Sequence, residues 1–269
     1  MHSHATATSA PRLIFRYRER LLNAVRQDIR QRYAGSVLGV LWALLYPLML
    51  LSIYSVLYLF IFKVRPASLE PHAYVVLVFS GLVPLLAFNE SLQAATNSLS
   101  ANRTLLLNTV FPVELLVVRA VLAAQFPSLA ALCITLVAGY GLGLTSWQAP
   151  VFIPLMWVLL LMFVCGLGWI LSLLVLVARD IQQALNLILM LLTILSPFAY
   201  TPDMVPPALK PLLYCNPLSY FVICFQHVVL YGQTPPLDML AVATGVALGS
   251  FYFGYWLFRR TKFVFFDHA

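Results

Sequence analysis

The stretch Val37–Phe62 reads VLGVLWALLYPLMLLSIYSVLYLFIF and contains no charged residue. The hydrocarbon core of a bilayer is about 30 Å thick, and a helix needs about 20 apolar residues to cross it. The whole chain has the same character, since 62% of its 269 residues are hydrophobic and only 9% are charged. Soluble domains carry about 25% charged residues. The composition therefore excludes a water-soluble enzyme, a disordered chain and a coiled coil, and it predicts an all-α integral membrane protein.

Further apolar stretches predict additional membrane spans. They are Ala73–Asn89, Leu115–Leu142, Val151–Ala178, Ala184–Tyr200 and Leu237–Phe258. The stretch Pro217–Gly232 is also apolar, but it is short and flanked by proline and glycine. If both basic ends of the chain lie on one side of the membrane, the number of crossings must be even. We therefore predict six spans, with an outer excursion over residues 201–236 that forms two short helices dipping back into the membrane.

The basic residues predict the orientation of these spans. Seven of the sixteen precede residue 33, and Arg259, Arg260 and Lys262 follow the last span. With six spans, twelve of the sixteen lie on the same side, which the positive-inside rule assigns to the cytoplasm. The net charge of +7 is thus an orientation signal, and nucleic acid is not expected as a partner. Both termini are predicted to be cytoplasmic.

The N-terminal region has a helical pattern of its own. Its apolar residues recur at helical spacing, and arginines occupy the other faces; the apolar residues are Ile14, Tyr17, Leu21, Val25 and Ile29. This pattern predicts an amphipathic helix in the cytoplasmic interface, within a tail that spans residues 1–36. A helix that docks on a soluble partner is the alternative. Residues 37–258 then form the transmembrane domain, and residues 259–269 form a C-terminal cytoplasmic tail.

Motifs for common chemistries are missing from the sequence. There is no GxxxxGK[ST] loop to cradle ATP, and neither HExxH nor GxSxG occurs. We therefore expect no catalytic residues, no metal and no cofactor bound by this chain. GxxxG pairs occur at Gly35/Gly39 and at Gly245/Gly249, where they either permit close helix contact or have no special role.

Ionisable and aromatic residues in the spans give further expectations. Arg119 is expected to reach the cytoplasmic surface or to pair with Glu114, and a substrate-facing role is the alternative. Glu90 is expected to end the second span. Trp42, Tyr46, Tyr54 and Tyr58 recur along one side of the first span. They either form an interfacial belt with packing contacts or line a path for a cargo that stacks on rings.

Several stretches resemble one family, the ABC transporter type 2 permeases that export lipid-linked O-antigen and teichoic-acid-like polysaccharides. The matching stretches are DIRQRYAGSVLGVLWALLYPL at Asp28–Leu48, NTVFPVELL at Asn108–Leu116, GLGWILSLLVLVARDIQ at Gly166–Gln182 and YCNPLSY at Tyr214–Tyr220. Together the matches run from residue 26 to residue 262, so the resemblance covers nearly the whole chain. The resemblance implies a permease subunit in the bacterial inner membrane that works as a homodimer with two copies of a separate ATPase. ATP and Mg would be bound by that ATPase.

The resemblance also implies roles for individual residues. The coupling helix on the ATPase would span about residues 97–112, and its residues would be Asn102, Arg103, Phe111, Pro112 and Glu114. A cytoplasmic turn would hold Arg179 and Asp180. Trp42, Tyr46, Tyr54 and Tyr58 would line the glycan path, and the excursion over residues 201–236 would be an outer gate.

Arg30 and Arg32 are placed to meet the pyrophosphate of a polyprenyl-linked glycan, because guanidinium groups bind phosphate oxygens in pairs. The alternative for both is contact with anionic membrane lipids. For the whole chain, the alternatives are a drug or lipid exporter permease of the same class and a membrane-embedded glycosyl- or acyltransferase. The sequence leaves open which glycan is carried, whether O-antigen, teichoic acid or capsule.

Overall fold

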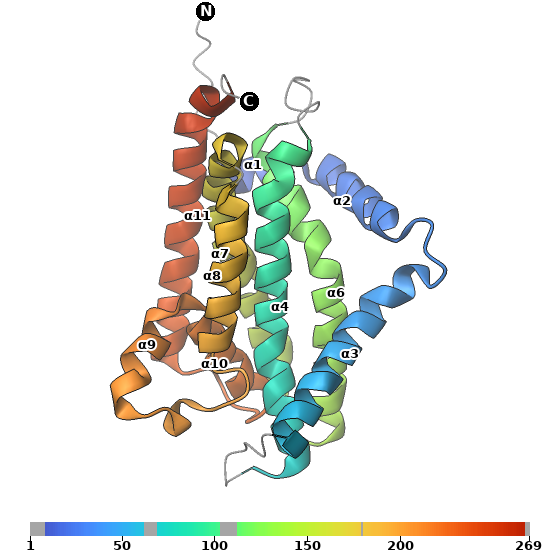
Figure 1. The fold of residues 1–269 in the computed structure, drawn as a ribbon, viewed down its shortest axis with the longest axis vertical. Coiled ribbons are helices and arrows are strands. Elements are labelled where there is room, and N and C mark those ends of the chain that lie inside the picture. The colour runs from blue at the N-terminus through green and yellow to red at the C-terminus, as the bar shows by residue number, and fades with distance from the viewer. Residues whose placement is uncertain (1–8, 62–68, 103–111, 179, 267–269) are drawn as a thin grey trace, which may run out of the picture.

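The computed structural model describes residues 9–61, 69–102, 112–178 and 180–266, and Figure 1 shows them as a bundle of long helices. The helices are α1 (Ala10–Arg16), α2 (Arg18–Tyr33), α3 (Trp42–Val56), α4 (Pro71–Ala101), α6 (Glu114–Gly141), α7 (Ala149–Val177), α8 (Asp180–Leu195), α9 (Lys210–Cys215), α10 (Pro217–Val229) and α11 (Leu237–Phe266). Short helical turns cover Gly39–Leu41, Leu57–Ile61, Pro202–Met204 and Pro207–Leu209. Every regular element in the described ranges is helical, which confirms the predicted class.

Five helical stretches are long and apolar enough to cross a membrane. They are Gly39–Val56, Pro71–Ala101, Glu114–Gly141, Ala149–Val177 and Leu237–Lys262. A sixth candidate is a pair of helices, Pro207–Cys215 and Pro217–Val229, bent by 98° at the break between them. A pair bent in this way is either a broken span or a re-entrant loop, and the excursion was predicted to be re-entrant. It lies at the end of the bundle opposite α1 and the last turns of α11 (Figure 1). We call these two ends the α9 end and the α1 end.

The predicted fifth span, Ala184–Tyr200, was wrong in both bounds. The helix found there is α8, whose 16 residues measure about 24 Å, less than the hydrocarbon core of a bilayer. It ends because Pro197 disfavours helical backbone at Ser196. The side-chain amide of Asn216, which precedes α10, donates to the Leu192 carbonyl at 3.1 Å and to Ser196 Oγ at 2.8 Å. The end of α8 is thereby tied to the start of α10.

The second span is longer than the predicted Ala73–Asn89. α4 has 31 residues and is about 46 Å long, so Glu90 lies within the helix and does not end it. The added turns are rich in small polar residues that bond to their own helix. For example, Thr96 Oγ1 donates to the Leu92 carbonyl at 2.7 Å, and Ser98 Oγ donates to the Ala95 carbonyl at 2.6 Å. Such residues can be buried between helices without unpaired polar groups.

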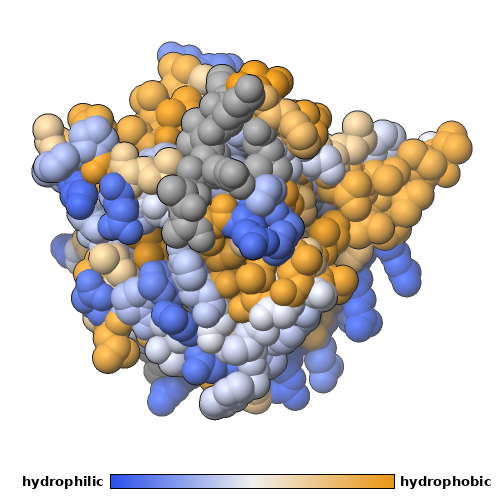
Figure 2. Space-filling model, turned by 90° about the horizontal axis from the view of Figure 1, so that it is seen from below, coloured by the Kyte–Doolittle hydropathy of each residue, from blue (hydrophilic) through white to orange (hydrophobic). Residues whose placement is uncertain are grey.

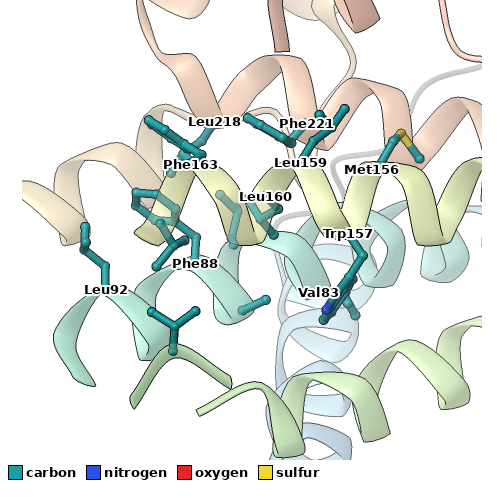
Figure 3. Packing of buried hydrophobic residues seen from close by; sticks show 14 of the residues in the cluster. Val83, Phe88, Leu92, Met156, Trp157, Leu159, Leu160, Phe163, Leu218 and Phe221 are labelled. Atoms are coloured by element: carbon teal, nitrogen blue, oxygen red, sulfur yellow. The ribbon is translucent and has the colours of Figure 1, made fainter. Parts of the chain in front are cut away.

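Within the hydrophobic core, aromatic contacts join α4, α7 and α10 (Figure 3). Phe163 of α7 stacks on Phe88 of α4, with ring centroids 5.3 Å apart, and on Phe221 of α10, at 5.9 Å. Trp157 of α7 meets Phe225 of α10 edge to face at 6.0 Å. α10 is buried along most of its length. The excursion is therefore built into the bundle through α10 and is not a loose surface loop.

α7 and α11 approach each other so closely at two glycines that any larger residue there would clash. A Cβ added to Gly254 would lie 2.2 Å from the carbonyl oxygen of Gly166, and a Cβ added to Gly166 would lie 2.2 Å from that of Ser250. These two glycines are the close-contact pair, and neither belongs to a predicted GxxxG motif. A Cβ at Gly245 or Gly249 would meet nothing within 4 Å. Backbone contact of this kind is how helices associate where apolar burial gives little driving force.

Gly35 and Gly39 shape the turn between α2 and α3. Both have positive φ, 77° and 52°, which favours glycine, and no atom lies within 4 Å of an added Cβ. They therefore serve backbone conformation and not helix packing. α2 and α3 diverge from the bundle to meet at this turn (Figure 1), and we call these two helices the arm. Seen from the α9 end, hydrophobic residues project to the right, on the side where the turn lies (Figure 2). Val37 is fully exposed there.

Candidate functional site

A pocket of about 440 Å³ lies between the arm and the bundle. Its lining comes from α2, α3, α4 and α6 and comprises Arg32, Tyr33, Trp42, Tyr46, Glu90, Gln93, Ala94, Asn97 and Pro127. We call it the arm pocket. Two groups of residues that the sequence analysis treated separately, the arginines of the N-terminal helix and the aromatic residues of the first span, meet here.

The contribution of α4 follows from helical spacing. Glu90, Gln93, Ala94 and Asn97 are three, four and seven residues apart, so they lie on one face of the helix. This face is polar at the depth where the neighbouring faces of α4 are buried. Because the predicted span ended at Asn89, this face was missed. The i, i+3, i+7 pattern of Glu90, Gln93 and Asn97 was the signal that marked it.

An ion pair holds α2 against the bundle. Arg119 of α6 donates through Nε to Asp28 Oδ2 at 2.6 Å and through Nη2 to Asp28 Oδ1, so both carboxylate oxygens are engaged. Of the expectations for Arg119, pairing with Glu114 was wrong, because the N-terminal helix brings Asp28 to it. Tyr33 also packs on Phe126 of α6, with ring centroids 6.1 Å apart. The Arg119–Asp28 ion pair is half-buried. Because both carboxylate oxygens are bound, it fixes the orientation of α2 as well as its distance from α6.

The apolar face predicted for the N-terminal helix is confirmed. Leu21 and Val25 are buried, and Ile14, Tyr17 and Ile29 pack against the core. The helix breaks at Tyr17 into α1 and α2. Its apolar face is therefore covered by the chain itself, which places Arg32 and Tyr33 at the edge of the arm pocket.

The arm pocket combines charged, hydroxyl and amide groups with aromatic rings. Burial raises the pKa of Tyr33, Arg32 lowers it and Glu90 raises it, and the net shift is upward. The phenol of Tyr33 therefore stays protonated at neutral pH and can donate a hydrogen bond. Arg32 offers paired donors that suit phosphate oxygens. Trp42 and Tyr46 offer ring faces, each about half exposed, on which an apolar ligand surface can stack.

Arg30 and Arg32 do not share a position in the structure. Both arginines are exposed, but Arg32 lines the arm pocket and Arg30 is not among the lining residues. The two are two residues apart on a helix and so face different directions. Only Arg32 is placed to meet a ligand in this pocket.

The four aromatic residues proposed to line a glycan path fall into two groups. Trp42 and Tyr46 line the arm pocket. Tyr54, further along α3, and Tyr58, in the helical turn Leu57–Ile61, stack on each other with ring centroids 6.4 Å apart. Both also meet Phe198 edge to face, at 5.5 Å and 6.0 Å. α3 thus carries two aromatic clusters about 12 Å apart along its axis, since Tyr46 and Tyr54 are eight residues apart.

The ends of the predicted coupling segment are described, but its centre is not. Residues 97–101 form the last turns of α4, so no separate helix begins there. Asn102 closes α4, with Nδ2 donating to the Ser98 carbonyl at 2.8 Å. Pro112 precedes α6 and accepts a bond from the Leu115 amide at 3.0 Å. Arg103 and Phe111 lie outside the described residues.

Glu114 is turned into the protein. Its side chain is buried, and Oε1 accepts a hydrogen bond from Lys262 Nζ of α11 at 2.7 Å. Its backbone carbonyl accepts from Trp169 Nε1 of α7 at 2.9 Å. Trp169 in turn packs on Phe251 and Tyr255 of α11. The start of α6 is therefore fastened to α7 and α11, and Glu114 is placed to anchor the segment that precedes it.

The predicted cytoplasmic turn is described only in part. Asp180 is exposed and begins α8, where a carboxylate is favoured by the helix dipole. Arg179 lies outside the described residues. Within the described part of the chain, no group of three or more His, Cys, Asp or Glu residues is arranged to hold a metal ion.

Comparison with known proteins gives the family. The model of the ABC-2 type transporter family matches residues 19–230. The chain is 28% identical over 213 residues to the O-antigen export system permease protein RfbA of Klebsiella pneumoniae, covering 79% of this chain and 80% of that one. It is 25% identical to the RfbA of Myxococcus xanthus, covering 88% and 90%, and 25% identical to the polysialic acid transport protein KpsM of Escherichia coli, covering 88% and 91%. Since the family model covers most of the chain, the protein belongs to the ABC-2 type transporter family.

Proposed function

We propose that this chain is the permease subunit of an ATP-driven exporter that moves a lipid-linked polysaccharide across the bacterial inner membrane. The observation that carries the proposal is the arm pocket, which joins the Arg32 guanidinium to the rings of Trp42 and Tyr46. A polyprenyl-pyrophosphate glycan offers a phosphate group next to a sugar ring, and these side chains suit both parts. The names of the relatives support a polysaccharide as the cargo.

The proposed orientation places the α1 end in the cytoplasm. Basic residues of α1, α2 and the end of α11 gather at that end, in agreement with the positive-inside rule. The arm pocket then lies on the cytoplasmic side, where lipid-linked glycans would enter. The α9 end, with the bent pair α9 and α10, would face outward and act as the gate.

We propose that the chain works as a homodimer with two copies of a separate ATPase subunit. Binding of ATP and Mg by that subunit would supply the energy, since this chain has no phosphate-cradling motif. The segment between Asn102 and Pro112 would contact the ATPase. Glu114 would pass its movement to α11 through Lys262 and to α7 through Trp169.

Co-purification tests the partnership. In mild detergent, the tagged chain is expected to bring down a subunit with a Walker A motif, and cells that lack the chain are expected to accumulate lipid-linked glycan inside and to lose it from the surface. The measurements are mass spectrometry of the purified complex and surface glycan staining. A chain that purifies without an ATPase under several mild detergents contradicts the ABC exporter assignment. A partner together with unchanged surface glycan points instead to a drug or lipid as cargo.

Removing the Lys262 charge is expected to uncouple ATP hydrolysis from export. Lys262→Met leaves the Glu114 carboxylate buried without its ion-pair partner, and breaking a buried pair costs about 3–5 kcal/mol. We expect export per ATP hydrolysed to fall severalfold, whereas Lys262→Arg retains the charge and most of the export. Arg260→Met removes a neighbouring exposed charge and serves as the matched control. Equal losses in Lys262→Met and Arg260→Met would show that the Glu114 contact has no special role.

A further inference from the structure

A second pocket, of about 390 Å³, lies at the α9 end of the bundle, apart from the arm pocket. It opens where the first residues of the excursion meet α10 and the start of α11, and we call it the excursion pocket. The polar and aromatic side chains of its lining include Asp203, Tyr214, Gln226, His227, Tyr231 and Gln233. Figure 2 views the molecule from this end, where hydrophilic residues are interspersed with hydrophobic ones.

The walls of this pocket are held by specific contacts. Gly232 turns the chain with φ of +60°, and an added Cβ would lie 2.7 Å from the Leu144 carbonyl oxygen. The next residue, Gln233, donates its backbone N–H to the His227 carbonyl at 3.1 Å. Gln226 is 3% exposed, and its Nε2 donates to the Pro197 carbonyl at 2.7 Å. The pocket is therefore a preformed feature of the fold.

The chemistry of the lining differs from that of the arm pocket. The imidazole of His227 packs on the ring of Tyr231 at 5.3 Å, and 42% of Tyr231 is exposed. Burial and, after it, the Asp203 carboxylate raise the pKa of Tyr231, so its phenol remains a donor. Asp203 brings a negative charge, and the described residues of the lining include neither lysine nor arginine. A phosphate would be repelled, because nothing in the lining compensates its charge.

A hydroxyl-rich ring without phosphate fits these groups. Its apolar face can stack on Tyr231 or Tyr214, as amphipathic rings favour. Its hydroxyls can donate to Asp203 and can exchange hydrogen bonds with the amide of Gln233, which has donors and an acceptor. We propose that the excursion pocket binds an uncharged sugar segment of the glycan as it leaves the protein. The inference rests on the proposed function for the identity of the cargo.

Cysteine protection tests the pocket in the purified full-length chain with its ATPase. Gln233→Cys is introduced together with Cys133→Ser and Cys215→Ser, which remove the two exposed native thiols. The rate of maleimide labelling is then measured with maltohexaose, mannohexaose, galactohexaose or inorganic pyrophosphate. We expect at least one hexasaccharide to slow labelling and pyrophosphate to leave it unchanged. Protection by no hexasaccharide, or equal protection by pyrophosphate, overturns the inference.

Tyr231→Ala is then added to the Gln233→Cys variant. It tests whether protection requires the sugar to stack on Tyr231 or only to block access to the thiol. Loss of one stacking face is expected to raise the protective sugar concentration roughly three- to tenfold. Tyr140→Ala is the matched control, because Tyr140 is exposed to a similar degree, 45%, and does not line the pocket. Equal protection in Tyr231→Ala and in Tyr140→Ala overturns the stacking assignment.

Surface glycan in cells distinguishes this inference from the proposed function. If deletion of the gene removes surface glycan and Tyr231→Ala restores it as fully as the native chain, the proposed function stands and the role of the pocket in export is wrong. If deletion leaves surface glycan unchanged, the proposed function fails, and the labelling experiment alone decides whether the pocket binds sugars. If Tyr231→Ala restores less glycan than Tyr140→Ala at equal protein levels, both are supported.

Discussion

Gly254→Ala is expected to destabilise the folded chain by about 1–3 kcal/mol or more, because overpacking forces neighbouring atoms apart. The added Cβ would lie 2.2 Å from the Gly166 carbonyl oxygen, which belongs to the backbone and cannot rotate away. α7 and α11 would have to separate along their whole contact. Thermal unfolding in detergent, followed by fluorescence-detected gel filtration, measures the loss.

The control lies on the same helix. Gly245→Ala places a methyl group where nothing lies within 4 Å, and alanine in a helix is favoured over glycine by about 0.5–1 kcal/mol. We therefore expect the two substitutions to change stability in opposite directions. Equal changes in both variants would mean that the α7–α11 contact is looser than described.

Arg32→Gln is expected to lower glycan export roughly tenfold or more at equal protein levels. Hydrogen bonds to charged groups contribute about 1.5–3 kcal/mol, and each 1.4 kcal/mol corresponds to a factor of ten in affinity. Arg32→Lys keeps the charge but loses the paired donors, so its export should fall between that of Arg32→Gln and the native chain. The rate at which labelled glycan reaches the cell surface is the measurement.

Arg30→Gln is the matched control, since Arg30 is on the same helix, exposed and outside the arm pocket. It is expected to change export little. If Arg30→Gln and Arg32→Gln lower export equally, the arginines act through general attraction to anionic lipids and a specific phosphate site is excluded.

The helices and most of their bounds were accessible from the sequence because apolar length decides membrane spans. The errors arose where side chains compensate for polarity. α4 continues past Glu90 because Thr96 and Ser98 satisfy their hydroxyls within the helix, which a hydropathy pattern does not register. α8 ends at Leu195 because Pro197 follows, and Asn216 satisfies the Leu192 carbonyl of its last turn from twenty-four residues further along the chain.

Ion pairs between residues far apart in the chain could not be predicted from the sequence. Asp28 binds Arg119 across 91 positions, and Glu114 binds Lys262 across 148. Spacing gives no clue to either pair, so the predicted partner of Arg119 was the nearest carboxylate. The glycines show the same limit. The GxxxG pattern pointed to Gly245 and Gly249, whereas the contact is made by Gly166 and Gly254, one on each helix.

The arm pocket was predictable only in part, since its α4 face was missed. Arg32, Trp42 and Tyr46 were named from the sequence, and the structure brings them together. It also separates Arg30 from Arg32, and Tyr54 and Tyr58 from Trp42 and Tyr46. The first division arises because residues two apart on a helix face different directions, and the second because Tyr46 and Tyr54 are eight residues apart along α3.

The arm pocket lies between the arm and the bundle. Under the proposed function it therefore opens sideways, toward the lipids of one leaflet. A cargo anchored by its lipid diffuses in two dimensions within one leaflet, and confinement of this kind raises its effective concentration at the opening. Modest affinity is then enough to keep the pocket occupied. Modest affinity also means rapid release, which suits a polymer that must advance unit by unit. The geometry of the arm therefore favours throughput over tight capture.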